Sequence, residues 1–131
     1  MAPHPFPFMP QPYILLAEDD LTIGEMMRLT LEESGYAVRS VRDGAETLAA
    51  VEERAPVLLF LDLLMPKKDG YAVLESLRES GHAFPVVVLS NLSDDRSRQR
   101  CTALGAASYF VKSNMDEEAL LDLVKEYARR A

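Results

Sequence analysis

The stretch Leu58-Leu59-Phe60-Leu61-Asp62-Leu63-Leu64-Met65-Pro66 decides how this chain of 131 residues is organised. Four apolar residues lead directly into one carboxylate, and a proline ends the run after three further apolar residues. A short, continuous apolar segment is typical of a strand that is buried on both faces of a parallel sheet. Asp62 would then lie at the carboxyl end of that strand, where open parallel sheets bind their ligands. The stretch alone leaves a second interpretation open, in which Asp62 only accepts local backbone hydrogen bonds.

Four other apolar segments predict four more strands, at residues 13–17, 36–41, 85–90 and 107–111. A helical pattern follows each strand, at residues 21–34, 43–54, 70–80, 93–104 and 115–130. Strands that alternate with helices through short connections predict right-handed crossovers and helices on both faces of one sheet. We therefore expect an α/β fold with a doubly wound, five-stranded parallel sheet and the flavodoxin-like strand order 2-1-3-4-5.

Polar residues that precede the helices predict where each one begins. Asp43 and Glu46 form a capping-box pattern, Asp69 precedes the third helix, and Asn114 is expected to cap the last one. The fourth helix is unusually polar, and Cys101 is one of few apolar residues that could anchor it. Such thin anchoring predicts an element of low stability, the kind that moves in switching.

Composition limits the class of protein. Hydrophobic residues make up 48% and charged residues 27%, which is typical of one soluble globular domain. The net charge of −7 disfavours nonspecific nucleic-acid binding by this domain. No segment predicts a membrane span or a secretory signal, and Cys101 alone allows no internal disulfide, so we expect a cytoplasmic protein. Five prolines within residues 1–12 predict a disordered tail, which leaves residues 13–131 as the folded domain.

Polar side chains follow four strands of the predicted sheet, and parallel strands bring their carboxyl ends to the same edge. These residues are Glu18, Asp19 and Asp20 after the first strand, Asp62 after the third, Ser90 after the fourth and Lys112 after the fifth. In the predicted strand order, carboxylates from two adjacent strands share a small space, where they raise one another's pKa unless a cation lies between them. Oxygen ligands of this kind suit Mg²⁺.

A divalent ion beside Asp62 favours phosphoryl transfer onto that carboxylate, because such chemistry depends mainly on positioning and charge neutralisation. Lys112 could contact one phosphoryl oxygen as an ammonium, and Ser90 could donate a hydrogen bond to another. Each of these features alone is more often structural than functional. Their joint occurrence at four strand ends favours the functional interpretation of Asp62.

The sequence resembles the receiver domain of bacterial two-component response regulators over residues 13–130. The matching motifs are Leu15-Leu16-Ala17-Glu18-Asp19-Asp20, Leu61-Asp62-Leu63-Leu64-Met65-Pro66 with Asp69-Gly70, Leu89-Ser90, and Tyr109-Phe110-Val111-Lys112. The resemblance implies that Asp62 is the phosphoacceptor. It also implies that Asp19, Asp62 and the Leu64 carbonyl bind Mg²⁺ directly, with Glu18 acting through water. Ser90, Lys112 and Tyr109 would be the phosphoryl-contacting and switch residues. The resemblance further implies a phosphohistidine donor on a sensor kinase or phosphotransfer protein, and a downstream protein target.

Three positions depart from the family's pattern. Ser113 stands where receivers usually have a proline after the lysine, so the local turn must be built differently. Asn91 replaces the very small residue that usually follows the switch hydroxyl. Asp20 adds a third acid, which we interpret as solvated charge at the start of a helix.

Two further expectations follow from the residues around the predicted site. Leu64 and Leu92, two positions after Asp62 and Ser90, cannot orient a water by hydrogen bonding, which predicts slow self-dephosphorylation. Arg96, Arg98 and Arg100 make the fourth helix basic, either as part of an output surface or only as charge that confers solubility.

Several alternatives remain open at this stage. The chain could be a stand-alone receiver that acts as a monomer or a weak phosphorylation-dependent dimer, the receiver piece of a longer regulator, or a pseudo-receiver that acts as a scaffold. We do not expect an enzyme, since phosphatases of the haloacid dehalogenase type need an acid where Leu64 stands. A flavin-binding role is disfavoured because Glu18-Asp19-Asp20 would repel phosphate.

Overall fold

A five-stranded parallel sheet forms the centre of the molecule. The structure, a computed structural model, describes residues 12–65, 67 and 69–128. The strands are β1 (Tyr13–Ala17), β2 (Ala37–Val41), β3 (Leu58–Asp62), β4 (Val86–Ser90) and β5 (Ser108–Val111). Their order is β2-β1-β3-β4-β5 with every neighbouring pair parallel, which confirms the predicted fold.

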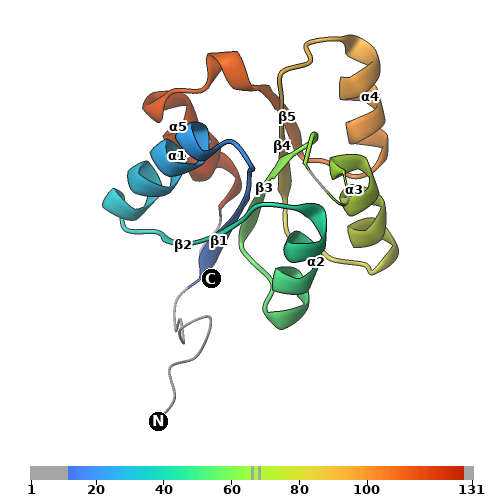
Figure 1. The fold of residues 1–131 in the computed structure, drawn as a ribbon, viewed down its shortest axis with the longest axis horizontal. Helices are drawn as coiled ribbons and strands as arrows, with labels where there is room; N and C mark the ends of the chain where they lie inside the picture. Colours follow the sequence, from blue (N-terminus) through green and yellow to red (C-terminus); the bar gives the residue numbers. More distant parts are fainter. Residues whose placement is uncertain (1–11, 66, 68, 129–131) are drawn as a thin grey trace.

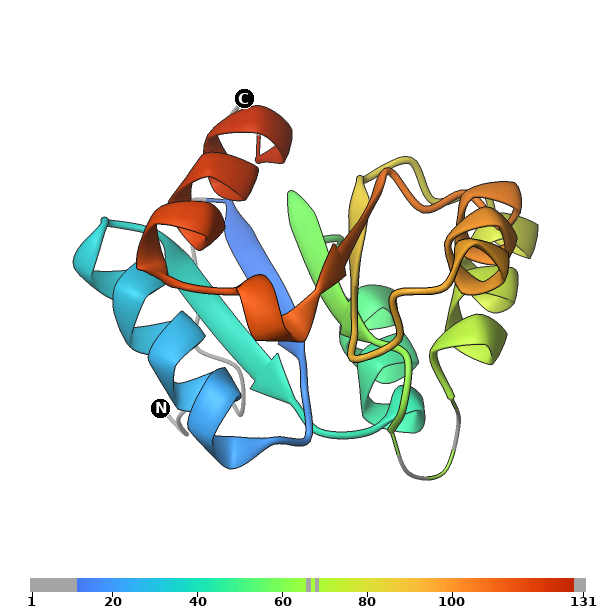
Figure 2. The ribbon, with the colours of Figure 1, turned by 90° about the horizontal axis from the view of Figure 1, so that it is seen from above.

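Helices cover both faces of this sheet (Figures 1 and 2). They are α1 (Leu21–Glu33), α2 (Gly44–Glu53), α3 (Gly70–Glu79), α4 (Asp95–Ala103) and α5 (Glu117–Tyr127). Figure 2 shows α1 and α5 on one face and α2, α3 and α4 on the other. The sheet therefore separates two apolar layers, one packed against each group of helices.

Strand β3 belongs to both layers, as its continuous apolar sequence predicts. All five of its residues are buried. Leu59 and Leu61 pack in the layer with α2 and α3, whereas Leu58 and Phe60 pack in the layer with α1 and α5. Each such side chain contributes roughly 1.5–3 kcal/mol on burial, so β3 is firmly held and its last residue, Asp62, has a fixed position.

The start of the last helix differs from the prediction. Asn114 does not cap it; instead Lys112–Asn114 form a short 3-10 turn, η1, and Asp116 is the N-cap of α5. The Asp116 side chain accepts a hydrogen bond of 2.8 Å from the Ala119 N–H. Met115 has extended backbone angles between the two elements and packs against the apolar layer, which separates the turn from the helix. The helix also ends earlier than the predicted residue 130, since its last residue is Tyr127 and Ala128 has extended backbone angles. The tail at residues 1–11 lies outside the described residues.

Helix α4 is weakly anchored, in agreement with its polar sequence. Ser97 and Cys101 are its buried side chains. Its N-cap is Asp94, whose side chain accepts a hydrogen bond of 2.8 Å from the Ser97 N–H. Few apolar contacts hold this helix to the sheet, so its position depends on polar and ring contacts at its surface.

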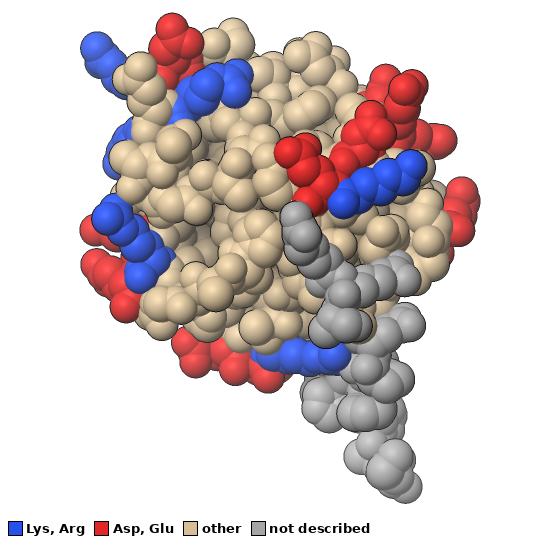
Figure 3. Space-filling model, turned by 180° about the vertical axis from the view of Figure 1, so that it is seen from behind, with Lys and Arg blue, Asp and Glu red and all other residues tan. Residues whose placement is uncertain are grey.

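The molecular surface is of mixed charge on the side that Figure 3 shows. Lys and Arg side chains lie beside Asp and Glu around the rim of a broad uncharged area. Among the described residues of this side, the basic groups form no continuous patch of the kind that tracks a phosphate backbone. Separately, none of the described helices has the length and apolarity that crossing a bilayer requires.

Candidate functional site

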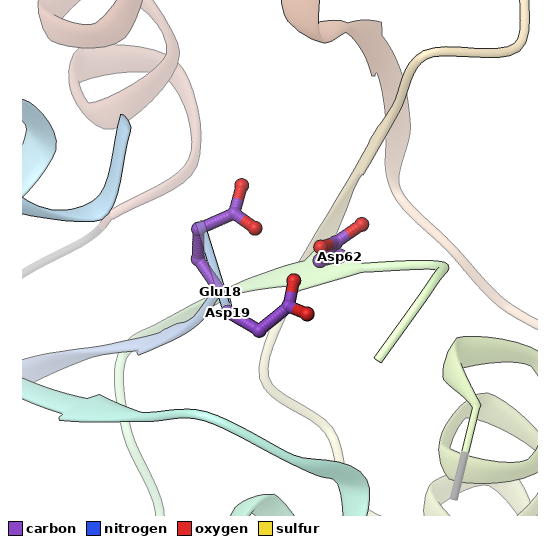
Figure 4. Close-up of side chains that lie close together, drawn as sticks. All are labelled: Glu18, Asp19 and Asp62. Atoms are coloured by element: carbon purple, nitrogen blue, oxygen red, sulfur yellow. The ribbon is translucent and has the colours of Figure 1, made fainter. Parts of the chain in front are cut away.

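The register of the sheet brings acidic residues together at the carboxyl ends of β1 and β3. Ala17 pairs with Leu61, so Glu18 and Asp62, the next residue of each strand, lie side by side. Figure 4 shows the carboxylates of Glu18, Asp19 and Asp62 facing a common space. One oxygen from each of these three groups lies within 4.8 Å of the others. The predicted convergence of these carboxylates is thus present in the structure.

Lys112 reaches this cluster from the turn η1 that follows β5, across the intervening strand β4. Its ammonium nitrogen lies 2.8 Å from Oε1 and 2.9 Å from Oε2 of Glu18. The same nitrogen donates a hydrogen bond of 2.9 Å to Oδ2 of Asp62. The lysine side chain is only 8% exposed, and those of Glu18 and Asp62 are 0% and 3% exposed. These are buried ion pairs in which one cation serves two carboxylates.

Burial and neighbouring charges shift the pKa values of Asp19, Asp62 and Lys112 in this cluster. Burial raises the pKa of Asp62 to about 6, and the adjacent Glu18 raises it as well, against the lowering effect of Lys112. Burial also raises the pKa of Asp19, with a further contribution from Asp62. For Lys112, burial alone would lower the pKa, but the carboxylates of Glu18 and Asp62 outweigh it and the pKa is raised. Three carboxylates around one ammonium leave an excess of negative charge.

The donor set fits a hard divalent cation. Oε1 of Glu18 is buried, and its partner among the described residues is the Lys112 ammonium at 2.8 Å. Carboxylate oxygens alone make up the cluster, and such ligands suit Mg²⁺ with several retained waters. A cation here would also offset the excess negative charge.

The loop after β3 holds Asp62 from the other side. Its Oδ1 accepts a hydrogen bond of 3.1 Å from the Leu64 N–H, so the local interpretation of Asp62 is also correct in part. Leu64 itself is 61% exposed. The loop returns to α3 through a hydrogen bond of 2.9 Å from the Gly70 N–H to the Leu63 carbonyl. The hydrogen bond from the Leu64 N–H orients the Asp62 carboxylate, and the bond from the Gly70 N–H holds the loop that follows it.

Ser90 and Tyr109 form hydrogen bonds with Leu92 in the loop after β4, and none of the described hydrogen bonds joins them to the acidic cluster. Ser90 is buried at the end of β4, where its Oγ accepts a hydrogen bond of 3.0 Å from the Leu92 N–H. Tyr109 is also buried, and its hydroxyl donates to the Leu92 carbonyl at 2.6 Å. Asp20 caps α1 by accepting from the Thr22 and Ile23 N–H groups, as expected for a charge at a helix start. The four clustered residues are therefore Glu18, Asp19, Asp62 and Lys112.

Three features around the site were not predicted from the sequence. The 3-10 turn at Lys112–Asn114 contains Ser113, which stands where receivers usually have a proline. Lys67 adopts a left-handed conformation with φ of 68° and pairs with Asp43 at 3.4 Å, which ties the loop after β3 to the start of α2. Gly70 packs directly on the backbone of β3. Of these, the turn had a sequence signal in Ser113, and the packing of Gly70 had one in the adjacent Asp69-Gly70 pair.

Comparison with known proteins identifies related sequences and folds. The sequence pattern of the response regulator receiver domain family matches residues 14–125. The chain is 39% identical to a probable transcriptional regulator, ycf27, of Porphyridium aerugineum over 76% of this chain and 41% of that protein. It is 33% identical to the transcriptional regulatory protein PcoR of Escherichia coli over 90% of this chain and 52% of that protein.

A solved structure resembles the whole fold. The receiver domain of the Francisella response regulator 1452 superimposes with a TM-score of 0.84 and 26% identity, covering 89% of this chain and 96% of that one. The chain therefore matches an isolated receiver along nearly its full length, whereas it spans about half the length of the curated relatives.

Proposed function

Because the chain belongs to the response regulator receiver domain family, we propose that it accepts a phosphoryl group on Asp62 and thereby switches a protein-binding surface. The observation that supports this most directly is the buried cluster in which Lys112 bridges Glu18 and Asp62. A buried cluster at the end of a parallel strand in which the pKa of one carboxyl, Asp62, is raised to about 6 is more typical of a functional site than of a stabilising ion pair. The role given to each residue below belongs to this proposal.

The transfer step requires little from the protein beyond positioning and charge. An oxygen of Asp62 forms a bond to phosphorus while the bond from phosphorus to the donor's imidazole nitrogen breaks, and the released imidazole takes up a proton. Lys112 is placed to neutralise one phosphoryl oxygen from its position 2.9 Å from Asp62. The Ser90 hydroxyl lies at the end of the adjacent strand β4, from which it would donate a hydrogen bond to a second phosphoryl oxygen.

Mg²⁺ is the cofactor that we infer for this site. Asp19, Asp62 and the carbonyl of Leu64 would hold the ion, with Glu18 acting through a bound water. When bound, Mg²⁺ would supply positive charge in addition to that of Lys112, which would neutralise negative charge on the transferring group. Its charge would also return the pKa of Asp62 toward the ordinary range, which keeps the attacking carboxylate ionised.

The partners follow from the same proposal. The donor is a phosphohistidine on a sensor kinase or a histidine phosphotransfer protein. The output surface consists of α4, β5 and α5, since α4 is weakly anchored and lies next to Tyr109. The related proteins named above are transcriptional regulators about twice as long, so the target is either a further domain or a separate protein. We place this activity in two-component signalling and not in metabolism.

The direct test is the intact mass of the protein after incubation with acetyl phosphate and Mg²⁺. We expect one phosphoryl adduct on the wild type, loss of that adduct when EDTA replaces Mg²⁺, and at least a hundredfold less adduct on Asp62→Ala. Asp122→Ala, which removes an exposed carboxylate of α5, is the matched control and should retain the adduct. A wild type that remains unmodified with its fold intact by circular dichroism would contradict the proposal. A pseudo-receiver disabled at Asn91 or Ser113 would then be the better description.

The lifetime of the adduct is a separate prediction. Hydrolysis needs an oriented water, and the side chains two positions after Asp62 and Ser90 are the exposed residues Leu64 and Leu92, which cannot hydrogen-bond. We expect Leu64→Glu to accelerate the loss of the phosphoryl group at least tenfold, at the low end of what a positioned acid or base contributes. The measurement is the decay of the adduct by intact mass after removal of the donor.

Leu29→Glu provides the control for this experiment. Leu29 is also an exposed leucine, but it lies on α1 away from the strand ends. Its substitution should leave the decay rate unchanged. If Leu64→Glu decays no faster than Leu29→Glu, the idea that Leu64 limits hydrolysis is wrong.

A further inference from the structure

A chain of contacts connects Ser90 to helix α4 on the side away from the acidic cluster. The Leu92 N–H donates to the Ser90 Oγ at 3.0 Å, and the Leu92 carbonyl accepts from the Tyr109 hydroxyl at 2.6 Å. The guanidinium carbon of Arg98 lies 4.8 Å from the centroid of the Tyr109 ring. Arg98 also donates a hydrogen bond of 3.2 Å to the Tyr109 carbonyl. Four contacts thus run from the switch hydroxyl to one arginine of α4.

The position of Tyr109 depends on both ends of this chain. Its ring is buried, and its hydroxyl is fixed by Leu92 in the loop between β4 and α4. Arg98 covers the ring from the surface, and because α4 has only Ser97 and Cys101 as buried side chains, apolar packing alone holds this helix weakly. The guanidinium is therefore a main contact between α4 and β5. A cation over an aromatic face is attracted by the ring's quadrupole, and the planar guanidinium can stack there.

The other arginines of α4 show that this contact is specific. Arg100 lies over a different ring, that of Tyr71 on α3, at 3.8 Å from its centroid. Arg96 is exposed, and its guanidinium makes no hydrogen bond or ring contact with a described residue. The basic character of α4 thus includes two arginines with ring contacts and one exposed arginine without such a contact. Arg96 and Arg98 carry the same charge on the same helix, which makes them a matched pair.

We propose that Arg98 is a positioning residue for the phosphoryl-accepting site: it holds Tyr109 in its buried position, and Tyr109 in turn fixes the loop that orients the Ser90 hydroxyl. The effect of Arg98 on phosphorylation rests on the proposed function of Asp62. The contacts of Arg98 with Tyr109 do not depend on that proposal. Because such coupling is reciprocal, a change in the position of Ser90 also changes how firmly α4 is held. Arg98 then links the state of the site to the output surface.

The geometric part is tested without any phosphoryl donor. Tyr109 is nitrated with tetranitromethane, and the rate is read by peptide mass spectrometry in the wild type, Arg98→Met, Arg98→Lys and Arg96→Met. We expect nitration of Tyr109 to become about three- to fivefold faster in Arg98→Met, the size of one partly exposed cation–π contact. Arg96→Met should match the wild type, and Arg98→Lys should recover most of the protection because an ammonium is still attracted to the ring.

The functional part uses beryllofluoride with Mg²⁺ as a phosphoryl mimic. We expect Arg98→Met to bind it about three- to fivefold more weakly than Arg96→Met, with Arg98→Lys in between. If the wild type binds no beryllofluoride, the proposed function fails, but the nitration rates still decide the role of Arg98. Equal nitration of Tyr109 in Arg98→Met and Arg96→Met would overturn the inference. So would hydrogen exchange that rises across all of residues 95–103 in Arg98→Met, since that would show a purely structural loss of the helix.

Discussion

Replacing Lys112 with methionine is expected to lower the free energy of unfolding by about 3 kcal/mol at pH 8. The substitution keeps much of the side-chain volume but leaves the buried carboxylates of Glu18 and Asp62 without their cation. An uncompensated buried charge costs far more than a surface ion pair contributes, because its hydration is lost and nothing replaces it. Urea unfolding followed by circular dichroism measures the change.

The pH dependence of this effect has a definite sign. Burial and Glu18 already raise the pKa of Asp62 to about 6 in the folded protein, and loss of Lys112 removes an effect that lowers it. A carboxyl whose folded-state pKa is raised binds its proton more tightly in the folded state, so stability falls as the pH rises through that pKa. At pH 5 Asp62 is largely protonated and needs no cation. The cost of Lys112→Met should therefore be smaller at pH 5 than at pH 8.

Lys125→Met is the matched control for Lys112. Lys125 lies exposed on α5, and its loss should change stability by less than about 0.5 kcal/mol at either pH. A Lys112→Met protein as stable as Lys125→Met at pH 8 would mean that solvent reaches Glu18 and Asp62 more easily than their burial implies. The same variant should also accept less phosphoryl group, since the proposed neutralisation by Lys112 is lost.

The sequence was sufficient to predict the fold because the decisive signals were local and consistent. Five short apolar runs alternate with helical patterns, and each strand found in the structure lies within one residue of its predicted bounds. The acidic part of the site was predictable for the same reason. Once the strand order is known, Glu18 and Asp62 must lie side by side at the ends of β1 and β3. Strand register alone carries this information.

The remaining features depend on tertiary contacts that no local pattern specifies. Asn114 and Asp116 are both good N-cap residues, and the choice of Asp116 follows from the 3-10 turn and from Met115 packing into the apolar layer. The stacking of Arg98 on Tyr109 joins residues of α4 and β5 whose sequence gives only a polar helix and an apolar strand. Such contacts arise when elements pack, so only the structure reveals them.

Gly70→Ala is expected to destabilise the protein by about 1–3 kcal/mol and to reduce phosphoryl transfer to Asp62 by more than tenfold. Propensity alone predicts the opposite sign, because alanine is better than glycine in a helix by about 1 kcal/mol. A Cβ at Gly70 would lie 2.6 Å from the Leu63 Cα and 2.8 Å from the Asp62 carbonyl oxygen. Both neighbours are backbone atoms, which cannot rotate away, so β3 or α3 must shift.

The shift falls on the peptide that carries the phosphoacceptor, which is why stability and activity should be lost together. Gly24→Ala separates this effect from the general effect of removing a helical glycine. A Cβ at Gly24 would meet the Glu18 side chain at an ordinary 3.7 Å, so this variant should be stabilised by up to about 1 kcal/mol. Urea unfolding and the rate of adduct formation with acetyl phosphate measure both properties in each variant. If Gly70→Ala gains stability as Gly24→Ala does, the contact between α3 and β3 is loose. The orientation of Asp62 would then be set by the hydrogen bond from Leu64 and the ion pair with Lys112.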